Sequence, residues 1–258
     1  MSRPACATRV RSPGCSTISR YTPTLVTARV SERSPRRTGR GPMGSALDPD
    51  ATNRLFDAVC GTATPSTEER AAIRAVYASL RDGEPVTVPR LATTVEWDEA
   101  RAHELLARLP NVERDATGAV IGFGGLTLRP TGHEITIEGA TRYAWCAWDT
   151  LFLPAAIDRE VTVASRCPVT AEPVTLRIAP TGILDRDPPE VVLSFLSPER
   201  IDPDDLRASF CGAVHFLVDS SAAEAWCAER DDRLVLELDD AHELGRELIQ
   251  RRCGRGAR

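Results

Sequence analysis

The spacing of apolar residues predicts an amphipathic helix near residue 70. Ser66 and Glu69 have the spacing of a capping box, in which a serine hydroxyl and a glutamate each accept from the other's backbone amide. Behind them, four apolar residues recur at the i, i+3, i+4 and i+7 positions of one helical face: Ile73, Val76, Tyr77 and Leu80. We therefore expect a helix that begins after Ser66 and ends at Gly83.

The following segment predicts two more helices and a hairpin. Residues 89–95 fit a short helix, and Asp98 is placed to cap a third helix with apolar residues again at helical spacing: Ala102, Leu105, Leu106 and Leu109. Strands at residues 112–114 and 120–123 flank a turn, and residues 122–125 are expected to form a bent part of the second strand. Three helices and a hairpin in this order are typical of a winged helix-turn-helix.

After residue 130 the pattern is that of short strands. Six strands and a closing amphipathic helix are predicted, at residues 134–138, 161–166, 174–178, 191–196, 214–218, 234–238 and 241–252. Because these strands do not alternate regularly with helices, the pattern favours an α+β fold with a mixed, mainly antiparallel sheet and flanking helices. We expect a winged-helix-like three-helix module over residues 45–130 and an α+β domain over residues 131–258.

The first part of the chain lacks this periodicity. Residues 1–42 hold nine of the 32 arginines and a single acidic residue, Glu32, among many Ser, Thr, Pro and Gly residues. Such a segment cannot bury enough apolar surface to offset its chain entropy, so residues 1–44 are expected to be a disordered, arginine-rich extension. Three interpretations stay open: an organellar transit peptide, a nucleic-acid-binding arm, or sequence upstream of a misassigned start at Met43.

Charge and hydropathy exclude several classes of function. Outside residues 1–42, 23 arginines face 36 acidic residues, and the chain contains no lysine. The predicted third helix is also net negative, and both features argue against nucleic acid as the main ligand. No apolar run approaches the roughly 18–20 residues of a membrane span. With no secretory signal visible, we expect a cytoplasmic protein with reduced thiols and no membrane partner.

Candidate chemistry first gathers in residues 142–152, which hold four of the thirteen aromatic residues. In a helix, Cys146 and Asp149 are three residues apart and share a face. Asp149 lies in an otherwise apolar stretch, so burial should raise its carboxyl pKa, and a protonated acid beside a thiol suits general acid catalysis. Taken alone, however, this spacing is more often an inert core cysteine followed by a capping aspartate.

A second group lies at residues 209–216. Cys211 and His215 are residue types for metal ligation, or for a nucleophile and its base, but their spacing specifies neither. A histidine in an apolar strand is more often a hydrogen-bonded core residue. The sequence contains no P-loop, G-x-S-x-G, H-E-x-x-H or C-x-x-C motif, so nucleotide binding, serine hydrolysis and zinc chemistry lack support.

Taken together, three segments resemble the bacterial organomercurial lyases (alkylmercury lyases). They are residues 143–151, residues 165–170 and residues 209–216, in the same order as in the family, within a similarity from about residue 65 to about 250. The resemblance implies protonolysis of a carbon–mercury bond, giving a hydrocarbon and Hg(II), and it makes residues 131–258 a catalytic α+β mercury-binding domain. It matches Cys146 and Cys211 to the two mercury-binding cysteines and Asp149 to their acidic partner.

The same resemblance suggests roles for three more positions. It matches Cys167 to a structural cysteine and Trp145 to an aromatic residue of the substrate pocket beside the nucleophile. Gly212 departs from the family, in which many members have a second cysteine directly after the one matching Cys211, and mercury release is the step this departure would alter. The remaining cysteines are expected to be dispensable, with the last two near the surface: Cys6, Cys15, Cys60, Cys227 and Cys253.

The resemblance also implies partners. Mercury is a soft cation and thiolate is the softest protein ligand, so no organic cofactor is expected. Hg(II) bound as product should pass to low-molecular-weight thiols or to a mercuric reductase. Two alternatives remain: a soft-metal-responsive winged-helix regulator or metal-binding protein, and a cysteine hydrolase using Cys211 and His215.

Overall fold

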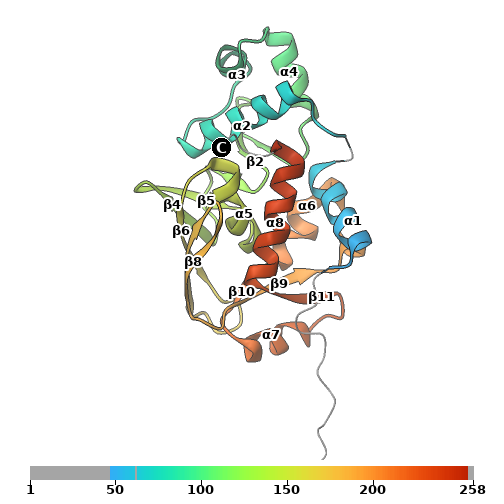
Figure 1. Cartoon of the computed structure of the whole chain (residues 1–258), viewed down its shortest axis with the longest axis vertical. Helices are drawn as coiled ribbons and strands as arrows, with labels where there is room; N and C mark the ends of the chain where they lie inside the picture. Colours follow the sequence, from blue (N-terminus) through green and yellow to red (C-terminus); the bar gives the residue numbers. More distant parts are fainter. Residues whose placement is uncertain (1–46, 62, 255–258) are drawn as a thin grey trace, which may run out of the picture. The chain divides into compact units, whose positions relative to one another are not determined.

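The computed structural model describes residues 47–61 and 63–254, so the extension expected over residues 1–44 lies outside the described residues. Figure 1 shows how helices and strands are arranged in this part of the chain. Its α-helices are α1 (Pro49–Cys60), α2 (Thr67–Arg81), α3 (Val88–Val95), α4 (Glu99–Arg108), α5 (Ala147–Ile157), α6 (Leu206–Ser209), α7 (Ser220–Cys227) and α8 (Leu238–Cys253).

The strands form two antiparallel sheets. The larger has the order β1-β2-β3-β5-β4-β6-β7-β8. Its strands are β1 (Val112–Arg114), β2 (Val120–Phe123), β3 (Leu126–Thr127), β4 (His133–Ile137), β5 (Ala140–Ala144), β6 (Val161–Arg166), β7 (Pro173–Ala179) and β8 (Gly182–Asp187). The smaller has the order β10-β9-β11, formed by β9 (Val192–Leu196), β10 (Phe216–Leu217) and β11 (Arg233–Glu237). The α+β class with a winged-helix-like N-terminal module is confirmed.

The helical module follows its local sequence signals. The Ser66 hydroxyl accepts from the Glu69 amide, and the Glu69 carboxylate accepts from the Ser66 amide, which forms the expected capping box. The predicted apolar face of α2 is buried, and Asp98 caps α4 through the Arg101 amide at 2.8 Å. The hairpin strands β1 and β2 have the predicted bounds, and β2 pairs through β3 with β5. The hairpin of the module is therefore part of the large sheet.

The core is built around α5, which is buried on nearly every side because almost all of its residues are apolar. Trp148 stacks edge-on against Phe152, Phe195 and Phe210, with ring centroids 5.2 to 5.9 Å apart. Its indole N–H donates to the Ala241 carbonyl of α8 at 2.9 Å. These contacts hold α5 between α8 and the segment that contains Cys211, and α8 and α5 lie beside one another in Figure 1.

The structure corrects several expectations. Only Phe216–Leu217 of the predicted strand 214–218 is a strand, and Cys211–Ala213 before it is a 3-10 turn. Residues 142–152 are the end of β5, a bend and the start of α5, so the helical condition under which Cys146 and Asp149 share a face holds only from the N-cap of α5 onward. The predicted bent strand at 122–125 ends at Phe123, because Gly124 and Gly125 take positive φ angles of 52° and 97°. Helices α1, α6 and α7 and strands β3, β5 and β8 were not predicted.

Cys253 is also corrected. It is 3% exposed rather than near the surface, because α8 continues to this residue and its last turn packs against the module. Arg74 of α2 donates to the Cys253 carbonyl at 2.6 Å, and Arg70 donates to the Gln250 carbonyl. Helix α8 therefore joins the two parts of the fold.

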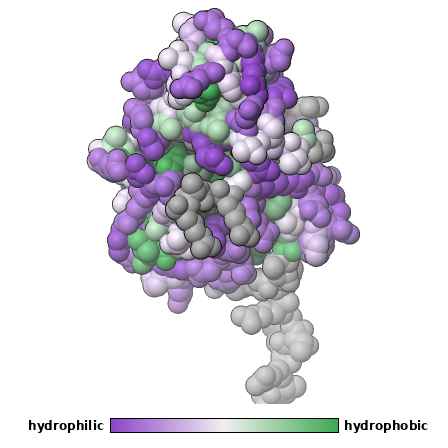
Figure 2. All heavy atoms as spheres, turned by 45° about the horizontal axis from the view of Figure 1, so that its top comes forward, coloured by the Kyte–Doolittle hydropathy of each residue, from purple (hydrophilic) through white to green (hydrophobic). Residues whose placement is uncertain are grey.

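The described residues include no helix that is both long and apolar enough to cross a membrane. The face drawn in Figure 2 is mainly hydrophilic, with smaller hydrophobic areas between the hydrophilic residues. Large apolar side chains are exposed only singly in the described residues, at Val169 and Leu184, which is ordinary for a protein surface.

Candidate active site

Cys146 and Asp149 are brought together by the N-terminus of α5. Strand β5 ends at Ala144, and Cys146 takes the extended N-cap conformation, with φ −144° and ψ 174°. Asp149 stands at the third helical position, where its Oδ2 accepts from the Cys146 backbone N–H at 2.8 Å. Asp149 therefore takes the role that a glutamate usually has in a capping box, in which the side chain at the third helical position accepts from the N-cap amide. The expected Cys-x-x-Asp pair therefore serves as a helix cap and is also available for chemistry.

Cys211 comes from a distant segment that is tied to the start of α5. Phe210 is packed against Trp148 and places Cys211 at the start of its 3-10 turn. The Ala147 N–H donates to the Val214 carbonyl at 3.3 Å, which links this turn directly to the first residue of α5. The Ser194 hydroxyl of β9 donates to the Ala213 carbonyl at 2.8 Å. The turn is thus held from two sides.

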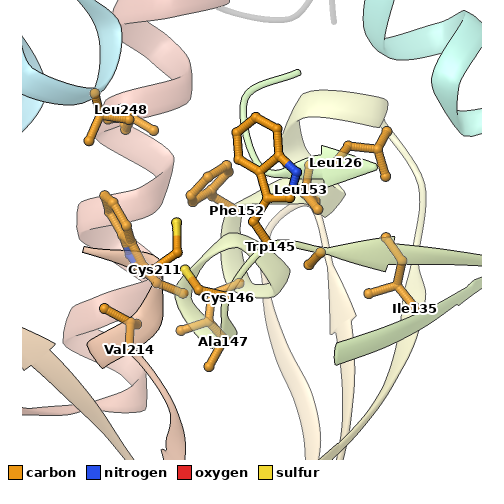
Figure 3. Packing of buried hydrophobic residues seen from close by; sticks show 14 of the residues in the cluster. Leu126, Ile135, Trp145, Cys146, Ala147, Phe152, Leu153, Cys211, Val214 and Leu248 are labelled. Carbon is orange, nitrogen blue, oxygen red and sulfur yellow. The ribbon is translucent and has the colours of Figure 1, made fainter. Parts of the chain in front are cut away.

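The two cysteines and the aspartate converge. Their ligand atoms all lie within 4.8 Å of one another, and Figure 3 shows the two sulfur atoms beside each other. Cys146 is fully buried, while Asp149 and Cys211 are each 7% exposed. This is the only such cluster of His, Cys, Asp and Glu among residues 47–61 and 63–254. Two soft sulfurs with one oxygen suit a soft, low-coordinate metal, and three donors fall short of the four that a closed structural zinc site needs.

Burial controls the protonation of this cluster. Removal from water raises the Asp149 pKa to about 6, although hydrogen bonds from Cys146 and the charges of Arg252 and Arg207 act in the opposite direction. Burial likewise raises the pKa of the Cys146 thiol well above its ordinary value, helped by its hydrogen bond with Cys211 and the charge of Asp149. The rise in the Asp149 pKa agrees with the prediction from its apolar surroundings.

A pair of glycines closes the site beside Asp149. Gly125 has φ +97°, and a Cβ there would lie 2.6 Å from the Asp149 Oδ1. The preceding Gly124 is fixed by the Tyr77 hydroxyl, which donates to its carbonyl at 3.0 Å. Arg252, 4% exposed, donates in turn to the Tyr77 oxygen at 2.8 Å. The void left beside Asp149 is about 10 Å³, room for about one water molecule.

Trp145 forms the wall next to the two sulfurs and is held by a carboxylate from the hairpin. The Glu113 Oε2 accepts from the Trp145 indole N–H at 3.2 Å and from the Thr127 hydroxyl at 2.8 Å. Arg129 lies 3.1 Å and Arg207 3.4 Å from the same carboxylate. The Arg207 guanidinium also lies over the Trp145 ring, 5.3 Å from its centroid. Glu113 thus connects the hairpin of the module to the site.

On its other side, Cys211 borders an open groove. This cavity of about 1060 Å³ is also lined by Trp145, Arg207, His133 and His215. Burial lowers the pKa of His133 to about 4, and it lowers the pKa of His215 as well. Both imidazoles are therefore neutral at neutral pH. Cys211 stands between the small void and the groove, because it lines both.

The remaining candidates lie outside the cluster. His215 donates from Nε2 to the Gly212 carbonyl at 3.0 Å, and the group of ligand atoms around Cys211 does not include it. Cys167 is 1% exposed, in the turn between β6 and β7. Sequence reasoning missed Glu113, Gly125, Arg207 and Arg252. The glycine pair was visible in the sequence, but nothing in the local pattern indicated that it abuts Asp149.

Comparison with known proteins agrees with this geometry. The profile described as alkylmercury lyase matches residues 126–250, and that of the helix-turn-helix domain of alkylmercury lyase matches residues 50–124. The alkylmercury lyase of Bacillus cereus is 41% identical over 173 residues, which cover 67% of this chain and 78% of that protein. That of Staphylococcus epidermidis is 38% identical over 68% of this chain and 80% of its own length.

A solved structure supports the fold. The mercury-bound form of MerB2 superposes with a TM-score of 0.64 at 23% identity, covering 78% of this chain and 99% of that one. The profiles and relatives together span the helical module, the large sheet and the cluster of two cysteines and an aspartate. The chain belongs to the alkylmercury lyase family.

Proposed function

We propose that this chain cleaves the carbon–mercury bond of organomercurials by protonolysis, with Cys146 and Cys211 binding mercury and Asp149 acting as the acid. The observation that carries the proposal is the convergence of two sulfurs and a carboxylate within 4.8 Å in a buried site. Linear two-coordinate mercury needs only two sulfurs, and the third group is free to carry a proton.

The first step is capture of the organomercury cation, R–Hg⁺, by one sulfur. Burial keeps the Cys146 thiol protonated, and Asp149 is its hydrogen-bonded neighbour. When the Cys146 sulfur binds mercury, its proton passes to the Asp149 carboxylate. The pKa of about 6 suits this carboxyl to accept that proton and later to give it up.

The second step breaks the carbon–mercury bond. Cys211 binds mercury next and loses its thiol proton to solvent in the groove. The second sulfur raises the electron density on mercury, so the attached carbon becomes more basic. Asp149 then protonates that carbon and R–H leaves, while the electron pair of the carbon–mercury bond forms the new carbon–hydrogen bond. Hg(II) stays on the two sulfurs and Asp149 returns to its ionised form, so no redox change occurs.

The walls of the site favour this reaction over its competitors. Cys146 is fully buried and the void beside Asp149 has room for about one water molecule, so bulk water is excluded from the site. Bulk water would otherwise compete with the carbon for the proton of Asp149. Trp145 gives an apolar surface for the alkyl or aryl group of the substrate, and Glu113 and Arg207 hold it there. We propose Trp145 as a residue of the substrate pocket.

Turnover then depends on removal of the product. We propose that the reaction uses no organic cofactor, that low-molecular-weight thiols or a mercuric reductase accept the Hg(II), and that the protein acts in the cytoplasm. Thiolate ligands exchange on mercury by substitution, so a second thiol is the natural acceptor. The Gly212 position, beside Cys211, offers no further sulfur for this exchange.

The regulator alternative is disfavoured by the surface of α4, the helix in the position of a recognition helix. Its Arg101 and Arg108 form ion pairs with Glu68 and Glu69 of α2, and the helix carries further acidic residues. Arginines neutralised in this way offer little to phosphates. We propose that the module acts as a scaffold for the site rather than as a DNA-binding domain.

The proposal is tested by measuring hydrocarbon in the headspace over purified protein, phenylmercury and excess thiol. Wild type should release benzene and Hg(II) repeatedly. Cys146→Ser should lose activity by at least about a thousandfold, because a hard hydroxyl replaces one of the two soft ligands. Cys167→Ser is the matched control, a buried cysteine outside the cluster, and it should keep the specific activity of its folded fraction. Full activity in Cys146→Ser would disprove the assignment.

A further inference from the structure

The groove beside Cys211 is larger than the protonolysis step requires. It has a volume of about 1060 Å³, whereas the space beside Asp149 is about 10 Å³. Cys211 and Trp145 line both spaces, while Asp149 lines only the inner one. The proton donor is thus on the closed side, and the outer face of Cys211 is the side by which a second molecule can reach bound mercury.

Two arginines supply positive charge along this groove. Arg166, at the end of β6, is exposed and donates to the Ala171 carbonyl at 3.0 Å. Within the part of the chain that the structure describes, it has no ion pair with a carboxylate. Arg207 keeps half of its side chain exposed, and the carboxylate that it contacts among the described residues, that of Glu113, lies 3.4 Å away. Both guanidinium groups can therefore bind an incoming carboxylate.

Two acidic residues also line the groove, and in the described part of the chain neither forms an ion pair with Arg166 or Arg207. Asp205 is occupied as the N-cap of α6, where it accepts from the Ala208 amide at 3.3 Å. Glu134 is exposed at the rim and is not paired with either arginine. Two cations therefore line the same cavity as Cys211, together with polar groups such as the His133 and Ser165 pair, joined at 2.8 Å.

We propose that this groove binds a low-molecular-weight thiol that carries a carboxylate, with its carboxylate on Arg166 and Arg207 and its sulfur directed at mercury on Cys211. The inference rests on the proposed function, since it names the molecule that removes the product. A thiol with no anionic group has no partner for these arginines, so the groove distinguishes acceptors by charge.

The exchange is a double substitution at mercury. A first carrier thiol forms a sulfur–mercury bond as the bond from mercury to the Cys211 sulfur breaks, and its proton goes to that sulfur. A second carrier thiol then displaces Cys146 in the same way. The products are a mercury ion bound by two carrier thiolates and two protein thiols, so protons and charge balance and nothing is oxidised or reduced.

The experiment separates release from protonolysis by loading the protein with one equivalent of inorganic Hg(II). Stripping of mercury is then followed against the concentration of 3-mercaptopropionate or of its neutral analogue 3-mercapto-1-propanol. Three proteins are compared: wild type, Arg166→Ala and, as a matched control, Arg177→Ala, an exposed arginine of β7 whose ion pair is with Glu160 outside the groove.

In wild type, the rate of mercury stripping should saturate as the concentration of 3-mercaptopropionate rises. Arg166→Ala should raise the half-saturating concentration about tenfold, because the variant loses one charge-assisted hydrogen bond to the carboxylate. The same variant should leave stripping by the neutral thiol unchanged, and Arg177→Ala should match wild type with both. An equal change with both thiols, or no change with either, would overturn the proposal.

A second measurement tests the proposed protonolysis independently of mercury release. Benzene released in a single turnover from stoichiometric phenylmercury, without added thiol, reports only protonolysis. Absence of benzene from wild type would contradict the proposed function. The stripping measurements with inorganic Hg(II) would still decide whether the groove selects carboxylate thiols.

Discussion

The two mercury-binding candidates, Cys146 and Cys211, occupy contrasting surroundings. Cys146 belongs to the closed half of the site, fully buried, fixed by its own helix cap and bonded to Asp149 three residues away. Cys211 belongs to the open half, on a short turn held by long-range contacts, with a groove on its outer face. This contrast fits the proposed mechanism, in which proton transfer to carbon needs a dry environment and metal release needs an accessible one.

The largest effect expected from disturbing the closed half is on the acid. Asp149→Asn should lower the rate of hydrocarbon release by about a hundredfold to ten-thousandfold, the usual contribution of a general acid. Mercury should still bind, because both sulfurs remain. Single-turnover benzene release and mercury titration of the same sample measure the two effects. Loss of both together would mean that Asp149 holds the metal rather than the proton.

The same substitution should change how stability depends on pH. The Asp149 pKa is about 6 in the folded chain and about 3.9 in an unfolded one, so the folded state binds the proton more tightly. The contribution of Asp149 to the free energy of unfolding is greatest below about pH 4. It decreases as the pH rises to about 6 and stays low above that pH. The loss is on the order of 3 kcal/mol.

An asparagine side chain carries no charge at any pH, so Asp149→Asn should be more stable than wild type at pH 8 and close to it at pH 4. Thermal unfolding of the two proteins at both values measures this difference, and the other titrating groups cancel because both chains share them. If wild type and Asp149→Asn differed in stability by the same amount at pH 4 and at pH 8, the raised pKa of Asp149 would be contradicted.

A smaller effect is expected from filling the glycine wall. Gly125→Ala would place a Cβ 2.6 Å from the Asp149 Oδ1 and should lower activity about a hundredfold by displacing the acid. Gly118→Ala is the control, because Gly118 also has a positive φ, +86°, but no atom lies within 4 Å of the added Cβ. It should cost about 1 kcal/mol of stability and no specific activity. Equal activity in both variants would show that the wall does not position Asp149.

The next largest effect on activity is expected from disturbing Trp145, which lines the open half of the site. Glu113→Ala removes the acceptor for the Trp145 indole N–H and should lower kcat/KM about tenfold, a typical loss for a residue that supports a metal site. Glu113→Gln keeps an amide oxygen there and should recover most of this loss. The comparison of phenylmercury with methylmercury is informative, since a displaced Trp145 should change the ratio of their kcat/KM values. A merely structural role would lower both equally.

The smallest effects are expected away from both halves. Cys167→Ser buries a hydroxyl in place of a thiol and should cost about 1 to 3 kcal/mol of stability. Cys227→Ser, at a half-buried site, should change stability by no more than about 0.5 kcal/mol. Denaturant titration measures both. A larger loss for Cys227 than for Cys167 would reverse this ranking.

Local patterns predicted the parts of the fold that local forces decide. The Ser66 cap and the apolar face of α2 depend on residues within one or two helical turns, so their positions could be predicted from the sequence. Strand β5 was missed because its burial pattern is mostly exposed and lacks alternation, and its place in the sheet depends on pairing with β3 and β4. Strand β8 was missed for the same reason.

The candidate site divides in the same way. Spacing put Cys146 and Asp149 on one face if the segment is helical, and the apolar neighbours of Asp149 predicted the rise in its pKa. That the pair forms the N-terminal cap of α5 was not predicted. The approach of Cys211 depends on Phe210 packing against Trp148 and on the hydrogen bond from Ala147 to Val214, which pair residues more than sixty positions apart. Without a resemblance to the family, nothing in either segment would have joined them.

The continuity of the eight-stranded sheet has a consequence for protein engineering. Because β3 bonds directly to β5, and β5 leads into Cys146, the N-terminal hairpin and the strand before the candidate site share one set of backbone hydrogen bonds. A truncated chain that begins at residue 131 would leave the edge of β5 unpaired and would take Glu113 away from Trp145. Minimal versions of this enzyme, or chimeras that exchange its amino-terminal half, therefore need to retain the hairpin even when the preceding helices are replaced.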